Sequence, residues 1–354
     1  MSTPNGQARW TPAQAHDWYA RQPWLFGSNF IPSTAINQLE MWQAETFDVA
    51  TVERELGWAA GLGMNTARVF LHDLLWSDAE GFCSRMDRFL AIAAGHGIRP
   101  LFVLFDDCWH DGAKLGPQPA PVPGRHNSGW LQAPGHSVVA DESQYPRLEA
   151  YVRGVVGAFA NDERVLGWDI YNEVTNGFLP AQALSDEERP AALAAAAKRR
   201  LERKAAHLRL MRLAFEWARA ARPRQPITAG AFMADREVNA LCHELSDVIS
   251  FHNYEPEERL LALIARLREY GRPMLCTEFM ARTRGSGFFE QLPIFQRERI
   301  GCYNWGLVNG KTQTHIAWTP QPGETRWFHD ILHADGTPYD AEEVAFIRRT
   351  TGTA

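Results

Sequence analysis

Residues 167–173 read Gly-Trp-Asp-Ile-Tyr-Asn-Glu, an apolar run that ends abruptly in an amide and a carboxylate. A polar loop with Thr175 and Asn176 follows it. Residues 272–279, Arg-Pro-Met-Leu-Cys-Thr-Glu-Phe, repeat the pattern and place Glu278 near the end of a second apolar run. Glutamate is poorly suited to a buried strand end unless it is paired or hydrogen-bonded. Both segments therefore indicate a buried strand that delivers a carboxylate at its C-terminus.

Similar short apolar runs recur along the chain and alternate with longer amphipathic segments. This alternation is typical of parallel strands joined by crossover helices. Eight such strands close a barrel, so we predict an α/β fold, a single (β/α)8 TIM barrel that forms one domain over residues 1–354. The candidate strands are Trp24–Asn29, Asn65–Leu71, Arg99–Phe105, Leu166–Tyr171, Pro226–Gly230, Asp247–His252, Met274–Thr277 and Gly301–Trp305.

Helical periodicity fills intervals between these strands. Apolar residues recur at helical spacing in Asp48–Gly61, and Glu257–Tyr270 ends at a glycine. A third helix is predicted over Lys198–Ala221, just before Pro223. Its expected inner stripe consists of Leu201, Leu208, Met211 and Phe215.

Two long insertions break this rhythm. Cys108–Pro146, rich in Gly, Pro, His and Trp, follows the third strand, and Asn176–Pro190 follows the fourth. Long segments without regular structure are usually functional. Both follow strand C-termini, the face where barrel enzymes carry their chemistry. We expect the first insertion, with Trp109 and Trp130, to close the cleft into a pocket.

Composition limits the partners. The formal net charge of −6 gives no basic footprint, so no nucleic-acid partner is expected. No apolar run has the length of a membrane span, so no membrane partner is expected either. The start of the chain lacks a secretory pattern, and the five cysteines are widely spaced without a C-x-x-C pair. These features predict a cytoplasmic protein with reduced thiols and leave the oligomeric state open.

Two carboxylates at one barrel mouth suit the hydrolysis of a glycosidic bond. One carboxylic acid must hold a proton for the leaving oxygen, and the other must be ionised to attack or stabilise the sugar cation. A separation of roughly 5–5.5 Å implies retention of configuration, and a wider gap implies inversion. The alternative for each glutamate alone is an ordinary salt bridge at the barrel rim.

The Asn-Glu at the end of the fourth predicted strand and the Glu of the seventh resemble the signature of clan A glycoside hydrolases. Family 5, with its cellulase-like members, is the group that the chain resembles most. The resemblance runs from about Gly27 to Trp305 and rests on short motifs. It implies an eight-stranded barrel, a retaining mechanism, Glu173 as the general acid/base and Glu278 as the nucleophile.

Further positions share the resemblance. Arg68 resembles the strand-two arginine that hydrogen-bonds the nucleophile, a contact that favours the ionised carboxylate. Asn172 resembles the asparagine that contacts the sugar 2-hydroxyl. His252 and Tyr254 resemble the strand-six pair that lines the site, and Trp305 resembles the tryptophan beneath the sugar at the cleavage point.

The third strand departs from the family 5 pattern. A histidine is common there, whereas residues 105–110 of this chain read Phe-Asp-Asp-Cys-Trp-His. We expect Asp107 and Trp109 to contact the sugar. Lys311, after the last strand, either contacts substrate hydroxyls or caps the barrel rim.

No cofactor and no metal are predicted. Asp106, Asp107, His110 and Asp111 could suggest a metal site, but adjacent strand residues point to opposite faces. We therefore expect a retaining β-glycosidase acting on β-linked oligosaccharides or glycosides, with carbohydrate as its only predicted partner. The alternatives are a carbohydrate-binding barrel without turnover and a transglycosylase that uses the same two glutamates.

Overall fold

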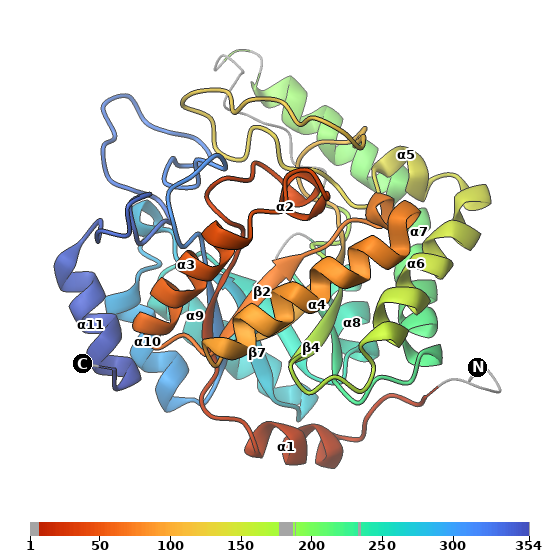
Figure 1. Cartoon of the computed structure of the whole chain (residues 1–354), viewed down its shortest axis with the longest axis horizontal. Helices are drawn as coiled ribbons and strands as arrows, with labels where there is room; N and C mark the ends of the chain where they lie inside the picture. The colour runs from red at the N-terminus through yellow and green to blue at the C-terminus, as the bar shows by residue number, and fades with distance from the viewer. Residues whose placement is uncertain (1–6, 177–186, 188, 233–234, 354) are drawn as a thin grey trace.

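A computed structural model describes residues 7–176, 187, 189–232 and 235–353 of the chain (Figure 1). Eight parallel strands form a (β/α)8 barrel in the order β5-β4-β3-β2-β1-β8-β7-β6. The strands are β1 (Phe26–Asn29), β2 (Thr66–Phe70), β3 (Arg99–Asp106), β4 (Gly167–Asn172), β5 (Ile227–Gly230), β6 (Ile249–Asn253), β7 (Met274–Phe279) and β8 (Gly301–Trp305). The predicted barrel is confirmed, with each strand within a few residues of its expected bounds.

The barrel is least regular along β4 to β7, where the predicted glutamates lie. The strands β5 and β6 are joined through a parallel bridge between Ala231 and Phe251. The register shifts between Asp169 and Asn172 on β4, and again where β6 and β7 carry His252 and Glu278. Irregularities of this kind are common at barrel rims, where they re-aim side chains.

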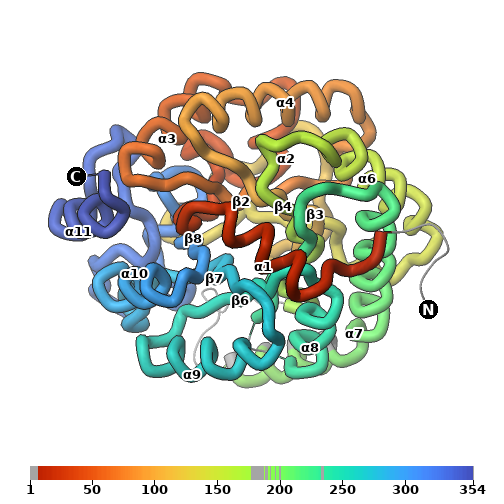
Figure 2. Tube along the Cα trace, turned by 90° about the horizontal axis from the view of Figure 1, so that it is seen from below, coloured from red at the N-terminus to blue at the C-terminus, as the bar shows by residue number. Residues whose placement is uncertain are grey.

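Helices surround the strands (Figures 1 and 2). They are α1 (Pro12–Ala20), α2 (Gln38–Trp42), α3 (Val49–Gly61), α4 (Ala79–Gly95), α5 (His136–Val139), α6 (Tyr145–Ala158), α7 (Arg189–Ala220), α8 (Arg236–Leu245), α9 (Glu257–Leu267), α10 (Phe288–Arg297) and α11 (Ala341–Thr351). Short 3-10 turns occur at Asp73–Asp78, Glu142–Gln144, Arg268–Tyr270 and Arg282–Arg284.

The predicted inner stripe of α7 needs one correction. Met211 and Phe215 are buried, but Leu201 is 68% exposed. The helix begins at Arg189, before the predicted start, and its first turns lie near the top of Figure 1. Leu201 therefore belongs to an outlying part of the helix, and only the later turns pack on the barrel.

Helix α1 covers the N-terminal ends of the strands. It crosses the centre of the barrel in the view of Figure 2. Trp18 and Tyr19 pack there in a separate apolar cluster, and the Tyr19 hydroxyl donates to the carbonyl of Arg299 at 2.6 Å. The other buried members of this cluster are Ala15, Leu25, Leu101, Leu166, Val248, Leu275 and Tyr303.

The insertion after β3 is built into the opposite, C-terminal face. It contains α5 and the turn Glu142–Gln144, and the indole of Trp130 donates to Asp106 Oδ2 at 2.7 Å. The backbones of Asp106 and Ala133 form an antiparallel bridge. The second predicted insertion, Asn176–Pro190, lies largely outside the described residues.

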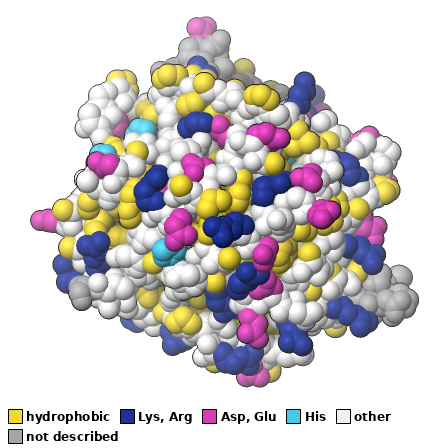
Figure 3. Space-filling model, in the orientation of Figure 1, with side chains coloured by type: hydrophobic (Ala, Val, Ile, Leu, Met, Phe, Trp, Pro, Cys, Tyr) yellow, Lys and Arg dark blue, Asp and Glu magenta, His cyan; other side chains and the backbone are white. Residues whose placement is uncertain are grey.

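None of the helices in the described residues is long and apolar enough to cross a membrane. On the face drawn in Figure 3, acidic and basic side chains are interspersed rather than gathered by sign.

Candidate active site

Glu173 follows β4 in a left-handed backbone conformation with φ 45°. His252 Nδ1 lies 2.6 Å from Glu173 Oε1. The thiol of Cys108 donates to Oε2 at 3.2 Å, and the side-chain amide of Asn176 donates to the same oxygen. Every one of these partners favours the ionised carboxylate.

Glu278 lies on β7 and is 5% exposed. Arg68 Nη1 donates to Oε1 at 2.8 Å, and the Tyr254 hydroxyl donates to Oε2 at 2.8 Å. His252 Nδ1 is 3.4 Å from the same Oε2. Glu278 thus has a fixed cation on one oxygen and neutral or titratable partners on the other.

Arg68 is fully buried on β2 and ties together several strands. Its Nε and Nη2 donate to Asp169 Oδ2 at 2.9 and 2.8 Å. The remaining bonds go to Glu278, to Asn29 at 2.9 Å and to Asn172 Oδ1 at 2.6 Å. Two carboxylates offset the buried charge of the guanidinium and raise the pKa of Arg68, although burial opposes this. Arg68 therefore remains charged and holds the ends of β2, β4 and β7 in one arrangement.

Gly230, at the end of β5, leaves room for this cluster. A Cβ there would lie 3.0 Å from His252 Nε2, 3.1 Å from Arg68 Nη2 and 3.1 Å from Asn172 Oδ1. Any larger residue would push against three polar groups of the site at once.

The two glutamates approach closely through His252. One carboxylate oxygen of each and an imidazole nitrogen of His252 all lie within 4.8 Å of one another. Burial raises the pKa of Glu278, and the charge of Glu173 adds to the rise, while His252, Arg68 and Tyr254 oppose it. Burial also acts to raise the pKa of Glu173, but His252, Asn176 and Cys108 hold it below its usual range. Without a substrate, Glu278 therefore holds a proton more readily than Glu173 does.

A pocket with a cavity volume of about 280 Å³ opens over the two glutamates. Its wall includes the aromatic residues Trp109, Tyr254, Trp305 and Trp318. The remaining lining residues are Cys108, His126, Asn127, Asn172, Glu173, Asn176, Phe232, His252, Glu255, Glu278 and Arg284. The mixture of aromatic faces and convergent polar groups suits a small polar ligand with apolar faces.

Most of the residues predicted for the site meet at this pocket. Seven line it, namely Trp109, Asn172, Glu173, His252, Tyr254, Glu278 and Trp305. Arg68 lies directly behind Glu278, as expected of a residue that bonds the predicted nucleophile. Their roles toward a substrate remain predictions.

Two predicted sugar contacts lie elsewhere. Asp107 is fully buried behind the site, where it accepts bonds from the Tyr171 hydroxyl at 2.7 Å and from the Thr175 backbone N–H at 2.6 Å. Asp107 is not among the residues that line the pocket, so the structure gives the predicted sugar contact no support. Lys311 pairs with Glu40 at 2.5 Å and is also outside the lining, which favours the alternative of a rim contact.

Cys108 is the residue that the sequence analysis missed most directly, because it stands between the two side chains chosen there. Alternation along an extended chain places Asp106 and Cys108 on one side and Asp107 on the other. In the structure Asp106 accepts a bond from Asn172 Nδ2 at 2.9 Å, and Cys108 contacts Glu173. The alternation was a usable signal. Asn176, Glu255, Arg284 and Trp318 come from loops and had no comparable signal.

Two groups of carboxylates and imidazoles are close enough to hold a metal ion within the described part of the chain. One is Glu173, His252 and Glu278, and the other is Asp107, His136 and His207. Asp107 thus clusters with histidines from α5 and α7 rather than with Asp106, His110 and Asp111. In both groups the side chains already bond to one another or to neighbours.

Comparisons with known proteins agree with the barrel. No protein-family model matches the chain, and no curated protein matches its sequence. A variant of GH5_18 from Streptomyces cattleya in complex with Manβ1-4GlcNAc aligns with a TM-score of 0.57 and 12% identity, covering 93% of this chain and 80% of that chain. An exo-β-1,4-mannosidase from Opitutaceae bacterium strain TAV5 gives a TM-score of 0.58 and 19% identity, covering 93% of this chain and 59% of that chain. A β-mannanase from the blue mussel Mytilus edulis gives a TM-score of 0.52 and 14% identity, covering 79% of this chain and 86% of that chain. At these identities, the chain shares its barrel fold with structures named as glycoside hydrolases.

Proposed function

We propose that this protein is a retaining β-glycosidase whose nucleophile is Glu278 and whose acid/base is Glu173. The observation that carries the proposal is the short separation of the two carboxylates, which have oxygens within 4.8 Å of one another at the floor of an aromatic pocket. Retaining enzymes keep their two carboxyl groups about 5–5.5 Å apart, whereas inverting enzymes leave about 6.5–9.5 Å for a water molecule.

The bond from Arg68 supports Glu278 as the nucleophile, although burial raises the pKa of Glu278. The partners of Glu173 keep it ionised in the free protein, so its role as an acid requires that a substrate displaces one of them. Arg68 cannot lose its proton under working conditions, so its bond favours an ionised Glu278 that attacks the anomeric carbon. Glu173 has only partners that can rotate or titrate. A leaving-group oxygen that replaces the contact with His252 would raise the pKa of Glu173 and allow it to act as an acid.

The reaction follows double displacement. Glu278 forms a bond to the anomeric carbon while Glu173 gives its proton to the departing oxygen. Glu173 then takes a proton from water, and the water oxygen bonds to the anomeric carbon as the bond to Glu278 breaks. The sugar leaves with its original configuration. Aromatic rings in the pocket wall would stack on the apolar sugar faces.

The substrate class follows from the pocket and from the structural neighbours. A volume of about 280 Å³ suits a short ligand rather than a long polymer. Neighbours named as an exo-β-1,4-mannosidase and a β-mannanase make β-linked mannosides and manno-oligosaccharides the first substrates to assay. Aryl β-glucosides and β-galactosides complete the panel.

Trapping the covalent intermediate tests the proposal. A 2-fluoro glycoside with a good leaving group should label Glu278, and the label should map to residues 275–280. Glu173→Ala should still form this intermediate and turn over slowly, and azide should rescue it to give a β-glycosyl azide from a β-substrate. Glu278→Ala should form no intermediate.

The alternatives give different results in the same assays. A label on Glu173, or a first product of inverted configuration, would contradict the assignment. Sugar binding without any turnover or label would indicate a binding barrel. Dominant transfer to added acceptor sugars would indicate a transglycosylase.

A further inference from the structure

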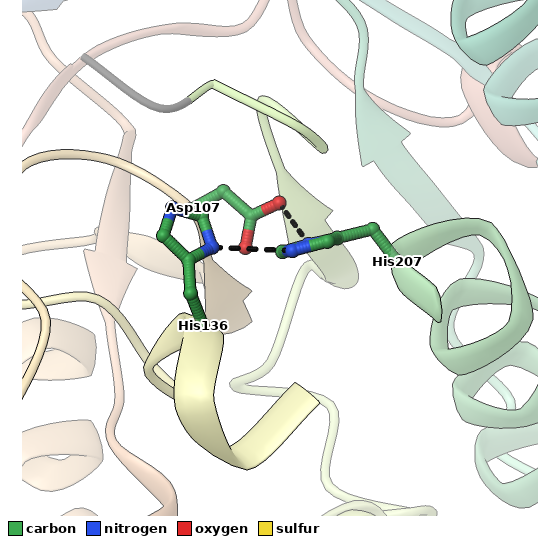
Figure 4. A group of neighbouring side chains, drawn as sticks. All are labelled: Asp107, His136 and His207. Atoms are coloured by element: carbon green, nitrogen blue, oxygen red, sulfur yellow. Dashed lines mark hydrogen bonds and ion pairs between the residues drawn. The ribbon is translucent and has the colours of Figure 1, made fainter. Parts of the chain in front are cut away.

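A line of four buried polar side chains contacts the turn that carries Glu173, and none of the four is among the pocket-lining residues. Three of them, Asp107, His136 and His207, come from the end of β3, from α5 and from α7 (Figure 4). His207 Nδ1 lies 2.6 Å from Asp107 Oδ2, and His207 Nε2 lies 3.1 Å from His136 Nδ1. The fourth member, Gln132, reaches His136 Nε2 at 3.0 Å. We call these four residues the relay.

The relay has one consistent direction of hydrogen bonds. Gln132 Nε2 also lies 3.1 Å from the backbone carbonyl of Asp107 and 3.2 Å from that of Trp109, which can only accept. This atom is therefore the amide nitrogen, which shares its two protons among three acceptors and cannot accept one itself. His136 Nε2 must then accept, which leaves the proton of a neutral ring on Nδ1. That proton goes to His207 Nε2, and His207 in turn donates from Nδ1 to Asp107. Burial lowers the pKa of His136, which favours the neutral ring that this order requires.

The carboxylate of Asp107 connects the relay to the turn that carries Glu173 through two hydrogen bonds. It accepts the Thr175 backbone N–H at 2.6 Å and the Tyr171 hydroxyl at 2.7 Å. Burial acts to raise the pKa of Asp107, but His207, His136 and Tyr171 hold it below its usual range. Glu173 and Thr175 both have positive φ, 45° and 71°. Such conformations persist only where neighbouring groups stabilise them, and Asp107 is one such group.

We propose that the relay is a positioning device that holds the turn Glu173–Asn176 and so fixes the direction of the Glu173 carboxylate. Asp107 is then a positioning residue, and its effect on catalysis rests on the proposed role of Glu173. A bound metal is the competing use of these side chains. The two nitrogens of the His207 ring point away from each other and engage different partners, so one ion cannot replace both contacts.

The unmodified protein tests the relay without any substrate. Nitrogen-15 NMR of the side chains should show that the rings of His136 and His207 each carry a proton on Nδ1. The Thr175 amide should exchange slowly with solvent. A proton on Nε2 of either ring, a rapidly exchanging Thr175 amide, or a shift of both ring signals on adding Zn²⁺ would overturn the proposal.

Leaving-group dependence tests the consequence for Glu173. His207→Gln should speed Thr175 amide exchange and lower kcat by about 10- to 100-fold more on glycosides with poor leaving groups than on those with good ones, because only poor ones need a well-placed acid. His243→Gln is the matched control, since it also removes a buried histidine but lies on α8 outside the relay.

Other outcomes separate the two proposals. A uniform loss across all leaving groups would show that His207 serves only stability and would overturn the relay. A protein that turns over no glycoside would contradict the proposed function. The ring tautomers and the exchange rate of the Thr175 amide would still show whether the relay holds the turn. These two measurements also decide it where His207→Gln fails to fold.

Discussion

Strain at single residues is concentrated where the candidate chemistry lies. Glu173, Thr175, Trp109 and Met280 all have positive φ although none is glycine. Conformations of this kind cost of the order of 1–3 kcal/mol each and persist only where the surroundings over-determine them. Three of the four flank or form the pocket over β3 and β4. The Gly230 carbonyl accepts the backbone N–H of Glu173, and the Cys108 thiol donates to its carboxylate. Asp107 accepts the backbone N–H of Thr175 in the same turn. These bonds stabilise the conformation of Glu173.

His252 is expected to set both limbs of the pH profile, because it contacts both glutamates. Without His252, each ionised carboxylate loses a partner that stabilises its charge, so the pKa values of Glu173 and Glu278 should both rise. The acidic limb of kcat/KM reports the ionised nucleophile and the basic limb reports the protonated acid. His252→Ala should therefore move both limbs to higher pH, each by about one unit. Initial rates measured from pH 4 to 9 check this.

Tyr254→Phe is the matched comparison for that measurement. Its hydroxyl donates to Glu278 alone, at 2.8 Å, so its loss should move only the acidic limb to higher pH. Equal shifts of both limbs in Tyr254→Phe, or unmoved limbs in His252→Ala, would show that these contacts do not govern the two carboxylates.

At this scale, the predicted residues that a strand end carries line the pocket, whereas the direction of residues beyond a strand end depends on local backbone. Glu173, Glu278, Asn172 and Trp305 follow from short motifs. Alternation just beyond β3 separates Cys108 from Asp107, but Trp109, with φ 70°, departs from the extended conformation one residue later. Lys311 was undecided for a similar reason, since its partner Glu40 is distant in sequence.

At the scale of elements, the insertion after β3 packs as an integral part of the C-terminal face of the barrel. Trp130 is 2% exposed and packs against Phe70 and Trp305, with ring centroids 5.1 and 5.5 Å away. The insertion also places Cys108 and Trp109 in the pocket. The sequence showed the boundaries of the insertion but not its packing, because an irregular segment has no repeating pattern of apolar residues from which its contacts could be predicted. Irregular register near the ends of β4, β6 and β7 was hidden for the same reason.

Trp109 is expected to be the main contribution of this insertion to substrate binding. Its indole lines the pocket and stacks on His126, with ring centroids 5.3 Å apart and an interplanar angle of 20°. Trp109→Ala should raise KM about tenfold, which corresponds to about 1.4 kcal/mol of lost binding energy. We expect a smaller change in kcat, because an indole offers a stacking face and does not exchange protons with the reacting bond.

Steady-state kinetics on the best aryl glycoside measures this effect. Trp58→Ala provides the control, because Trp58 is half-buried on α3, under the guanidinium of Arg54 and outside the pocket. An unchanged KM in Trp109→Ala would remove the insertion from substrate binding.

At the scale of the whole molecule, the two ends of the barrel have separate tasks. The C-terminal ends of the strands carry the glutamates and the pocket, while α1 seals the N-terminal ends (Figure 2). Barrel enzymes generally separate chemistry and stability in this way. The barrel itself was predictable, because the alternation of strands and helices runs through the chain. The seal by α1 was not among the predictions, although Thr11 and Gln14 form a capping box at its start and Pro12 is its first residue.

This separation predicts that a substitution in α1 weakens folding without touching catalysis. Trp18 is 7% exposed and packs among apolar side chains from several strands, so Trp18→Ala should lower the free energy of unfolding by about 3 kcal/mol. Leu261→Ala, at a 38% exposed position on α9, should change it by less than about 0.5 kcal/mol. Urea titration of both variants gives the two values.

The same variant also tests whether the two ends are independent. Because the pocket lies at the other end of the strands, kcat and KM of folded Trp18→Ala should equal those of the unmodified protein. A loss of kcat in fully folded Trp18→Ala would mean that the N-terminal end of the barrel also controls the geometry of the two glutamates.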